Sequence, residues 1–369
     1  MSKRKLTYSQ VGDDYSTKDP TKKIALVAAR QTAEEMAKKG YREISDTRGE
    51  SAFVWATPNN QFTASVIEGL GTKNLVADAM RKITGKTYYD TLGHDTVATI
   101  INDLITVGAK PMVIHAYWGV ENNSWLQDEE RMNDLITGWK EACILAEIAW
   151  GGGETPTLKG IIVPNTIMLG GSAVGVVPSQ DKIITDSKLK DKDRILLLKS
   201  NGINTNGLSL ARAIAKKLPA GYSTKLNSDI MYGEALLTKT NIYARLVNSL
   251  ISSDIDIHYI SNITGHGHRK IMRSPRKFTY YIENIFEPQE VFLFTQKYAN
   301  LSDYDMYEEF NMGMDYAIFL QAEDADKALE IIKHNGFEGL DAGYIEEGER
   351  KVVIKPKNII FEGISLDLR

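Results

Sequence analysis

Residues 93–103 read Gly-His-Asp-Thr-Val-Ala-Thr-Ile-Ile-Asn-Asp, a stretch whose apolar residues recur with the period of a helix. At about 100° per residue, Asn102 lies about 20° and Asp103 about 80° around the helix axis from Asp95. An acid near the start of the helix and a polar pair two turns later therefore share one side. Oxygen ligands in this arrangement suit Mg²⁺, which takes a few carboxylates and leaves its other positions to water and phosphate. The alternative is a helix capped by Asp95, with a solvated Asn-Asp pair.

Helical patterns and short apolar runs alternate on both sides of this stretch. The segments that we expect to form strands are 51–56, 62–67, 111–118, two strands within 161–177, and 194–199. The segments that we expect to form helices are 22–39, 74–83, 95–107, 128–147, 208–217, 234–252 and 324–335. The polar run 178–193 lacks periodicity and is the best candidate boundary. We therefore predict an α/β (α+β) fold of two domains, residues 1–178 and 179–369.

The composition is that of an ordinary globular protein. The 369 residues are 43% hydrophobic and 25% charged, with 44 Lys and Arg against 48 Asp and Glu, a net charge of −4. This charge argues against nucleic acid or an anionic membrane as the main partner. No apolar run reaches the roughly 18 residues of a membrane-spanning helix. The lone Cys143 excludes an intrachain disulfide and is interpreted as a buried thiol. The basic residues 1–5 precede a polar segment, so we expect a cytoplasmic protein.

Two glycine motifs in the first half also carry acids. Gly151-Gly152-Gly153-Glu154-Thr155 follows a long helical pattern, and its glycines would bring the backbone close to a ligand beside one carboxylate. Glu68-Gly69-Leu70-Gly71-Thr72-Lys73 ends a strand and offers one acid, backbone amides and a cation, as a metal–phosphate site requires. The alternatives are a plain glycine loop and a tight turn that ends in a surface lysine. Together with the 93–103 helix, these motifs predict a Mg²⁺–nucleotide site.

Three other motifs carry less weight. Gly85-Lys86-Thr87 lacks the first glycine and the strand–loop–helix context of a P-loop, so we reject it. Asn204-Thr205-Asn206-Gly207 precedes a helix, where capping residues are expected in any case. His266-Gly267-His268 indicates a flexible glycine loop with two solvated imidazoles rather than a metal site.

Several motifs also occur in the order typical of a known family. Glu68–Lys73 is similar to Asp-Gly-Val-Gly-Thr-Lys, Gly152–Thr155 matches Gly-Gly-Glu-Thr, and Asn206–Leu210 is similar to Ser-Asn-Gly-Tyr-Ser-Leu. Ile263–Gly267 is similar to Leu-Thr-Gly-Gly-Gly, and Phe310–Gly313 to Phe-Asn-Cys-Gly. Through these motifs the chain resembles the aminoimidazole ribonucleotide synthetases, or phosphoribosylformylglycinamidine cyclo-ligases, of the PurM-like superfamily.

The resemblance implies a two-domain fold in which the N-terminal domains of a homodimer pair, with nucleotide bound near that interface. It implies an ATP-dependent ligase of purine biosynthesis that converts formylglycinamidine ribonucleotide to aminoimidazole ribonucleotide and releases ADP and phosphate. Carried over motif by motif, it implies catalysis by Glu68, Lys73 and Asp95; ATP binding by Gly69, Gly71, Thr72, Lys73, Asn102, Gly152, Gly153 and Thr155; Mg²⁺ binding by Asp95, Asp103 and Glu154; and ribonucleotide binding by Asn204, Thr205, Asn206, Gly265, His266 and Gly267.

Some positions depart from the family pattern. Glu68 is one methylene longer than the family's Asp, Asn204 stands where the family has His, and His266 replaces a glycine. Thr157 replaces an acid, and the glycine-rich segment that covers phosphate in the family is replaced by Arg42–Phe53, which has a single glycine. These changes leave two other functions open: a related ATP-dependent enzyme that phosphorylates a different small-molecule acceptor, and a non-catalytic nucleotide-binding homologue.

Overall fold

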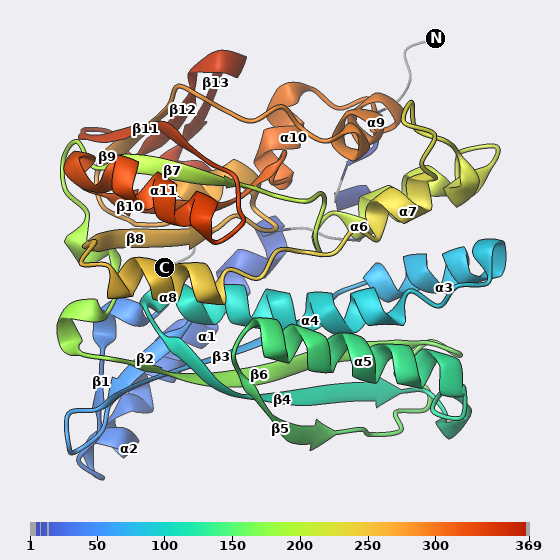
Figure 1. Ribbon diagram of the computed structural model, residues 1–369, viewed down its shortest axis with the longest axis horizontal. Coiled ribbons are helices and arrows are strands. Elements are labelled where there is room, and N and C mark those ends of the chain that lie inside the picture. The colour runs from blue at the N-terminus through green and yellow to red at the C-terminus, as the bar shows by residue number, and fades with distance from the viewer. Residues whose placement is uncertain (1–4, 8, 13–14, 367–369) are drawn as a thin grey trace.

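The computed structural model describes residues 5–7, 9–12 and 15–366, which form two halves, each built around one sheet (Figure 1). The strands of the first half are β1 (Arg42–Glu43), β2 (Phe53–Ala56), β3 (Phe62–Gly69), β4 (Lys110–Val120), β5 (Ala149–Glu154) and β6 (Ile167–Val177). They pair in the order β1-β2-β3-β6-β4-β5, and every pair is antiparallel except β4 with β5. The helices of this half are α1 (Tyr15–Gln31), α2 (Ala33–Ala37), α3 (Lys73–Thr84), α4 (Tyr89–Leu104) and α5 (Glu129–Leu145).

The second half holds a larger sheet. Its strands are β7 (Arg194–Lys199), β8 (Ile257–Asn262), β9 (Phe278–Ile282), β10 (Met314–Leu320), β11 (Gly339–Glu347), β12 (Lys351–Ile354) and β13 (Ile359–Glu362). They pair in the order β13-β12-β9-β11-β7-β10-β8, and only β12 with β9 is parallel. The helices are α6 (Leu208–Ala215), α7 (Tyr232–Leu236), α8 (Ala244–Ser252), α9 (Glu290–Ala299), α10 (Asp303–Glu309) and α11 (Ala325–His334). The α/β class expected from the sequence is confirmed.

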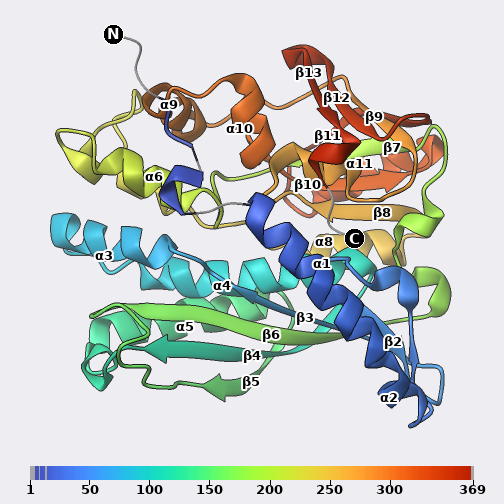
Figure 2. The same ribbon diagram turned by 180° about the vertical axis from the view of Figure 1, so that it is seen from behind.

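A layer of helices separates the two sheets. In both views, α3, α4 and α5 lie on one face of the first sheet, between that sheet and the second half (Figures 1 and 2). The alternation along β4 explains the arrangement, because Ile114, Ala116 and Trp118 are buried whereas His115 and Tyr117 are exposed. The first sheet therefore buries one face under helices and exposes the other.

Two glycines bring α4 and α5 close together. A Cβ atom added to Gly138 would lie 1.9 Å from the carbonyl oxygen of Asp90, and one added to Gly93 would lie 2.5 Å from that of Leu135. Both distances are too short for any side chain, so the helices pack backbone to backbone at these points. This packing turns the polar side of α4, with Asp95, toward the second half.

Most of the expected helices and strands are confirmed, with ends shifted by a few residues. The expected helix at 22–39 is instead the two helices α1 and α2, and the run 161–177 contains only one strand, β6. The expected helix at 234–252 is interrupted between α7 and α8, because side chains of α4 bind the backbone of this connection. Glycines 151–153 lie in strand β5 rather than in a loop. Because α4 begins at Tyr89, Asp95 lies inside the helix and does not cap it.

Two interpretations of composition can be compared with the structure. Cys143 is buried on α5, as expected, and burial raises the pKa of its thiol to about 12. Among the described residues, no helix combines the length and the apolar character that crossing a membrane requires.

Candidate functional site

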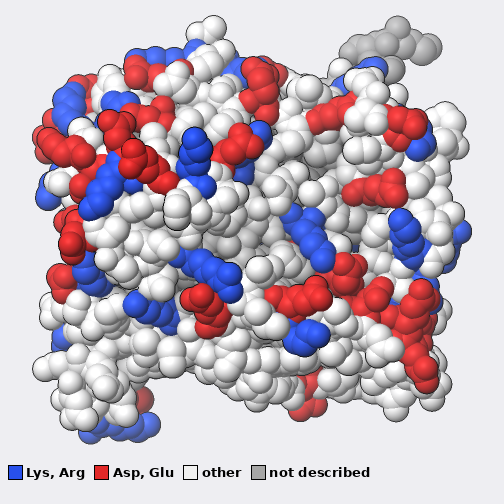
Figure 3. Space-filling view, in the orientation of Figure 1, with Lys and Arg blue, Asp and Glu red and all other residues white. Residues whose placement is uncertain are grey.

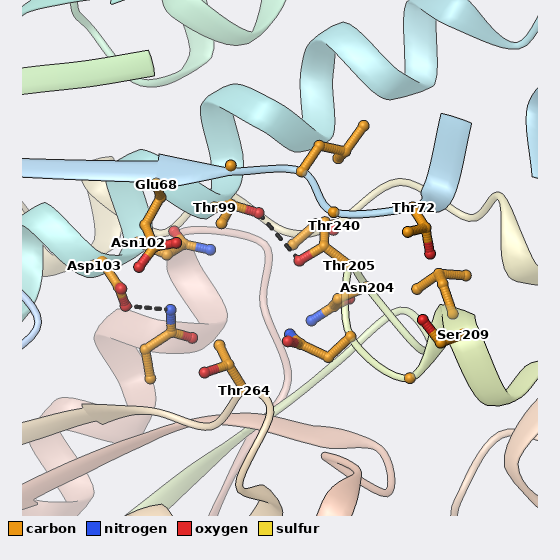
Figure 4. A pocket seen from close by; sticks show the side chains of 17 residues that line it. Glu68, Thr72, Thr99, Asn102, Asp103, Asn204, Thr205, Ser209, Thr240 and Thr264 are labelled. Carbon is orange, nitrogen blue, oxygen red and sulfur yellow. Dashed lines mark hydrogen bonds between the residues drawn. The ribbon is translucent and has the colours of Figure 1, made fainter. Parts of the chain in front are cut away.

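Two adjoining cavities lie between the helix layer and the second half of the chain. The first, of about 230 Å³, is lined by the β3–α3 turn, by α4, and by the loops that precede α6 and follow β8 (Figure 4). The second, of about 390 Å³, extends from the first toward α1 and the segment before β2. Because Glu68, Asp103, Asn206 and Thr264 line both cavities, we treat them as one site.

The first half supplies carboxylates and hydroxyls to one wall of this site. The turn after β3 brings Glu68 and Thr72 to the first cavity, and Gly71 permits the turn by adopting a φ of +75°. On α4, Thr99 and Asp103 are one turn apart and both line the cavity. Figure 4 shows Glu68 and Asp103 on the same wall.

The second half supplies amides and hydroxyls to the opposite wall. Asn262 Nδ2 donates a hydrogen bond to Asp103 Oδ1 at 2.8 Å, and the hydroxyls of Thr99 and Thr205 are 3.2 Å apart (Figure 4). These bonds join the halves at the edge of the first cavity. Asn204, just before Thr205, has a φ of +57°, a conformation that asparagine tolerates better than most residues.

A buried ion pair lies behind this wall. Lys73 Nζ is 2.5 Å from Asp95 Oδ2, and both side chains are 0% exposed. The same ammonium donates to the carbonyl oxygens of Asn204 at 3.0 Å and Thr238 at 2.9 Å, while Asp95 Oδ1 accepts a bond from the Thr240 N–H at 2.8 Å. The three N–H groups of Lys73 and both oxygens of Asp95 are thus in use.

Other side chains of α4 bind the same connection of the second half. His94 Nε2 is 2.8 Å from the carbonyl oxygen of Thr240, and Asn102 Nδ2 donates to the carbonyl oxygen of Asn241 at 2.8 Å. Asn102 Oδ1 accepts a bond from the Tyr243 N–H at 3.0 Å. Asn102 therefore borders the cavity, but its side-chain amide binds the backbone of residues 241–243. The resemblance predicts ATP binding for this residue and gives no sign of these bonds.

A buried carboxyl supports Asn204 from behind. Asn204 Nδ2 donates to Asp315 Oδ2 at 2.8 Å, and the Tyr243 hydroxyl donates to Asp315 Oδ1 at 2.6 Å. Burial raises the pKa of Asp315 to about 6. Asn204 stands where the family has a histidine, so this position holds an amide, and the Asp315 carboxyl group fixes it.

The second cavity has basic side chains at one end. Lys22, Lys270 and Arg273 line it, together with the segment Gly49–Ser51 that stands in place of the family's glycine-rich segment. Arg273 holds that segment, since its guanidinium donates to the Gly49 carbonyl oxygen at 2.7 Å and the Ser51 hydroxyl at 3.2 Å, and pairs with Glu50 at 3.2 Å. A side-chain cation therefore anchors the segment over the cavity.

The histidines after β8 are buried, so the expectation of a flexible loop with solvated imidazoles is wrong. His266 lines the second cavity with its Nε2 3.1 Å from Asp19 Oδ2, and burial together with nearby cations lowers its pKa to about 2. His268 is fully enclosed and its Nε2 is 2.9 Å from the carbonyl oxygen of Asn311. Burial lowers the pKa of His268 to about 4. Both imidazoles are neutral near pH 7.

Glu68 and Asp103 have the chemistry that a magnesium ion needs. Both carboxylates line the same two cavities, and burial and the charge of Asp103 raise the pKa of Glu68 to about 6. Such mutual repulsion would be relieved by a bound cation. The described residues contain no cluster of three or more His, Cys, Asp or Glu that could hold a metal ion, so water and phosphate would have to complete the coordination of Mg²⁺.

The structure brings together most, but not all, of the predicted site residues. Those that line the cavities are Glu68, Gly69, Gly71, Thr72, Asn102, Asp103, Asn204, Thr205, Asn206, Gly265 and His266. Lys73 and Asp95 lie behind the wall as an ion pair and line neither cavity, and each carboxylate oxygen of Asp95 already accepts a hydrogen bond. Gly152, Gly153, Glu154 and Thr155 are exposed at and just beyond β5 and line neither cavity. Gly267 packs on the backbone of Tyr307 and Glu308 instead.

The sequence reasoning missed several residues of the site. These are Lys22, Leu26, Thr99, Ser209, Thr240, Asn262, Thr264, Lys270 and Arg273. Thr99 could have been found, because it lies on the same side of the helix as Asn102 and Asp103. Lys270 and Arg273 carry no such signal, since surface lysines and arginines are common in any sequence.

Comparisons with known proteins agree with this arrangement. The pattern described as "AIR synthase related protein, N-terminal domain" matches residues 49–177, and that described as "AIR synthase related protein, C-terminal domain" matches residues 190–355. The chain belongs to the AIR synthase related family. The first match contains strands β2 to β6 and the second contains β7 to β12, and the resemblance inferred from the motifs is confirmed.

The chain is also similar to individual relatives and to solved structures. It is 33% identical to the phosphoribosylformylglycinamidine cyclo-ligase of Methanobrevibacter smithii over 89% of this chain and 91% of that protein. Its fold is similar to that in a HypE–HypF complex, with a TM-score of 0.61, 16% identity, and coverage of 86% and 93% of the two chains. It is also similar to hydrogenase maturation protein HypE in complex with ATP, with a TM-score of 0.54, 15% identity, and coverage of 73% and 79%.

The buried ion pair predicts a large loss of stability in the Lys73→Met variant. Removing the ammonium leaves Asp95 buried without its partner, which costs about 3–5 kcal/mol of unfolding free energy. Urea denaturation followed by circular dichroism measures this loss. Lys82→Met, on the exposed side of the same helix, is the matched control and should change stability by less than about 0.5 kcal/mol. A Lys73→Met variant as stable as the control would contradict the assignment.

The buried carboxyl of Asp315 predicts a pH dependence of stability. Its folded pKa of about 6 lies above its ordinary value of 3.8, so the folded state holds the proton more tightly than the unfolded state. Stability from this group is present below about pH 4 and is lost as the pH rises to about 6. Relative to Asp315→Asn, the wild-type protein should lose about 2–3 kcal/mol over that range in chemical denaturation. The exposed Glu323→Gln variant should follow the wild type, and parallel curves for Asp315→Asn would disprove the effect.

Proposed function

We propose that this protein is an ATP- and Mg²⁺-dependent cyclo-ligase that converts formylglycinamidine ribonucleotide to aminoimidazole ribonucleotide. The observation that carries the proposal is one cavity that joins the carboxylates Glu68 and Asp103 to basic side chains, in a chain that is 33% identical to a cyclo-ligase over 89% of its length. A metal–phosphate site needs both kinds of charge side by side. The solved HypE complex with ATP supports a nucleotide as the phosphoryl donor.

The chemistry divides between the nucleotide and the chain. ATP would supply the phosphoryl group that turns the formyl oxygen into a leaving group before the ring closes. The carboxylates of Glu68 and Asp103 would hold Mg²⁺ against the phosphates, and the backbone of the turn that contains Gly69 and Gly71 would orient them. Catalysis on this scheme rests on positioning and electrostatics rather than on a covalent intermediate with the protein.

The ribonucleotide would occupy the wall formed by the second half. Asn204, Thr205 and Asn206 offer amides and hydroxyls there, as ribose and amidine groups require. Asn204 is held by Asp315 and has no proton to exchange near neutral pH. A different small-molecule acceptor is therefore the second candidate, and product identity separates the two.

The exposed face of the first sheet supports the expected homodimer. Ile67 on β3 is 78% exposed and Met168 on β6 is 41% exposed, and Met112, Tyr117 and Val176 are exposed on the same sheet. The lower part of the molecule in Figure 3, where Figure 1 places β4 to β6, carries few charged side chains. Exposed apolar surface on one face of a sheet is typical of a protein interface, and we propose that a second copy of this chain covers it.

Coupled turnover tests the function. Purified protein with ATP, Mg²⁺ and formylglycinamidine ribonucleotide should form ADP and aminoimidazole ribonucleotide in equal amounts.

The Asp103→Asn variant should lose at least about tenfold in Mg²⁺-dependent ATP affinity by calorimetry, because one metal-binding carboxylate is gone. Asp326→Asn, on the exposed side of α11, is the control.

Other outcomes of this experiment have distinct meanings. ADP without aminoimidazole ribonucleotide would favour a different acceptor. Neither product would leave a nucleotide-binding homologue. If Asp103→Asn binds Mg²⁺ and ATP as the wild type does, Asp103 is not part of the metal site.

The dimer predicts a specific effect of charge on the sheet face. Met168→Lys should shift the protein from dimer to monomer in sedimentation equilibrium, because a buried unpaired ammonium opposes association. The matched control is Ile364→Lys, whose side chain is 92% exposed in the second half and should leave the dimer intact. A wild-type protein that is monomeric at tens of micromolar would overturn the proposed interface.

A further inference from the structure

Two lysines of the site region are buried, and they differ in how their N–H groups are used. Lys73 has three acceptors, Asp95 Oδ2 and the carbonyl oxygens of Asn204 and Thr238. Lys270, on the short helical turn Gly267–Met272, is 6% exposed and donates to Thr264 Oγ1 at 2.6 Å. Among the residues that the structure describes, it has no second hydrogen-bond acceptor and no carboxylate within 4 Å.

An ammonium in that situation is costly for the fold. Lysine has three N–H groups, and a buried ammonium with a single hydrogen-bond acceptor leaves two of them without a partner in the described part of the protein, which destabilises the folded state. Burial and the charge of Arg273 lower the pKa of Lys270 to about 8, while Asp103 and Glu68 act in the opposite direction. A cost of this kind is explained if a ligand satisfies the remaining N–H groups.

The neighbouring cations are already engaged. Arg273 binds Gly49, Ser51 and Glu50, and Lys22 on α1 lies 3.6 Å from Asp19. Lys22 is an exposed side chain in a 3.6 Å ion pair, so Lys270 is the buried cation of the second cavity whose N–H groups remain for a ligand. The ligand that it attracts must carry negatively charged oxygen atoms.

Two carboxylates of the same cavity restrict that ligand further. Glu68 and Asp103 line the same cavity as Lys270 and would repel a bare anion. An anion that arrives with a divalent cation satisfies both sides, because the cation meets the carboxylates and the anion meets the ammonium. A metal-bound phosphoryl group has this charge distribution.

We propose that the Lys270 ammonium binds phosphoryl oxygens of a metal-bound polyphosphate in the second cavity. The inference rests on the proposed function for the identity of the anion, and it adds a binding residue that none of the family motifs quoted above contains. Lys270 thereby does with a side chain what a glycine-rich segment does with backbone amides. The segment Gly49–Ser51, which Arg273 anchors, lines the same cavity.

Binding of inorganic tripolyphosphate, measured by calorimetry in buffer with Mg²⁺, tests the proposal without turnover. Lys270→Met and Lys270→Gln should weaken binding at least about tenfold, whereas Lys270→Arg should stay within about threefold. Lys297→Met, on the exposed side of α9, should bind as the wild type does. A second titration uses Mn²⁺ alone, and Lys270→Met should bind it several-fold more tightly because a positive charge near Glu68 and Asp103 is gone.

A merely structural lysine would not produce these opposite changes in anion and metal affinity. Folded Lys270→Met that binds tripolyphosphate as tightly as the wild type overturns the proposal. If the variants do not fold, amine labelling of the wild type gives the answer by mass spectrometry: tripolyphosphate should protect Lys270, and equal labelling with and without it overturns the proposal. Anion binding through Lys270 without formation of aminoimidazole ribonucleotide would refute the cyclo-ligase alone.

Discussion

The buried pair of Lys73 and Asp95 is the interaction on which the rest of the site depends. An ammonium and a carboxylate can lose their water only if almost every hydrogen-bonding atom finds a partner. In this protein the partners are the backbone groups of Asn204, Thr238 and Thr240, all in the second half. The pair therefore stabilises one relative position of the two halves, and that position forms the cavities between them.

The same requirement explains the shape of the connection between α7 and α8. A continuous helix would use the backbone groups of residues 240–243 internally. Instead, His94, Asp95 and Asn102 of α4 bind them. Polar residues two turns apart on one helix thus organise a loop from a distant part of the chain, and the loop in turn completes the first cavity.

The site shows how much the spacing of residues along the chain can predict about which side chains line a cavity. Helical geometry placed Asp95, Asn102 and Asp103 on one side, and the structure turns that side toward the second half. Helical geometry does not reveal that Asp95 binds Lys73 and Thr240 and that Asn102 binds Asn241 and Tyr243. Asp103, on the same side of the helix, still lines the cavity. The triple glycine before Glu154 was equally ambiguous, because an edge strand and a ligand-binding loop share that composition.

By itself the sequence determined the α/β class, the family and most of the loops that line the cavities, because periodicity and short motifs are local properties. The tertiary structure decided which charged groups are free to act. Lys73 and Lys270 both have polar neighbours in the sequence. Among the described residues, Lys73 has an acceptor for each of its three N–H groups, whereas Lys270 has one acceptor. The difference arises from segments more than a hundred residues apart, whose contacts depend on packing and desolvation rather than on any local pattern.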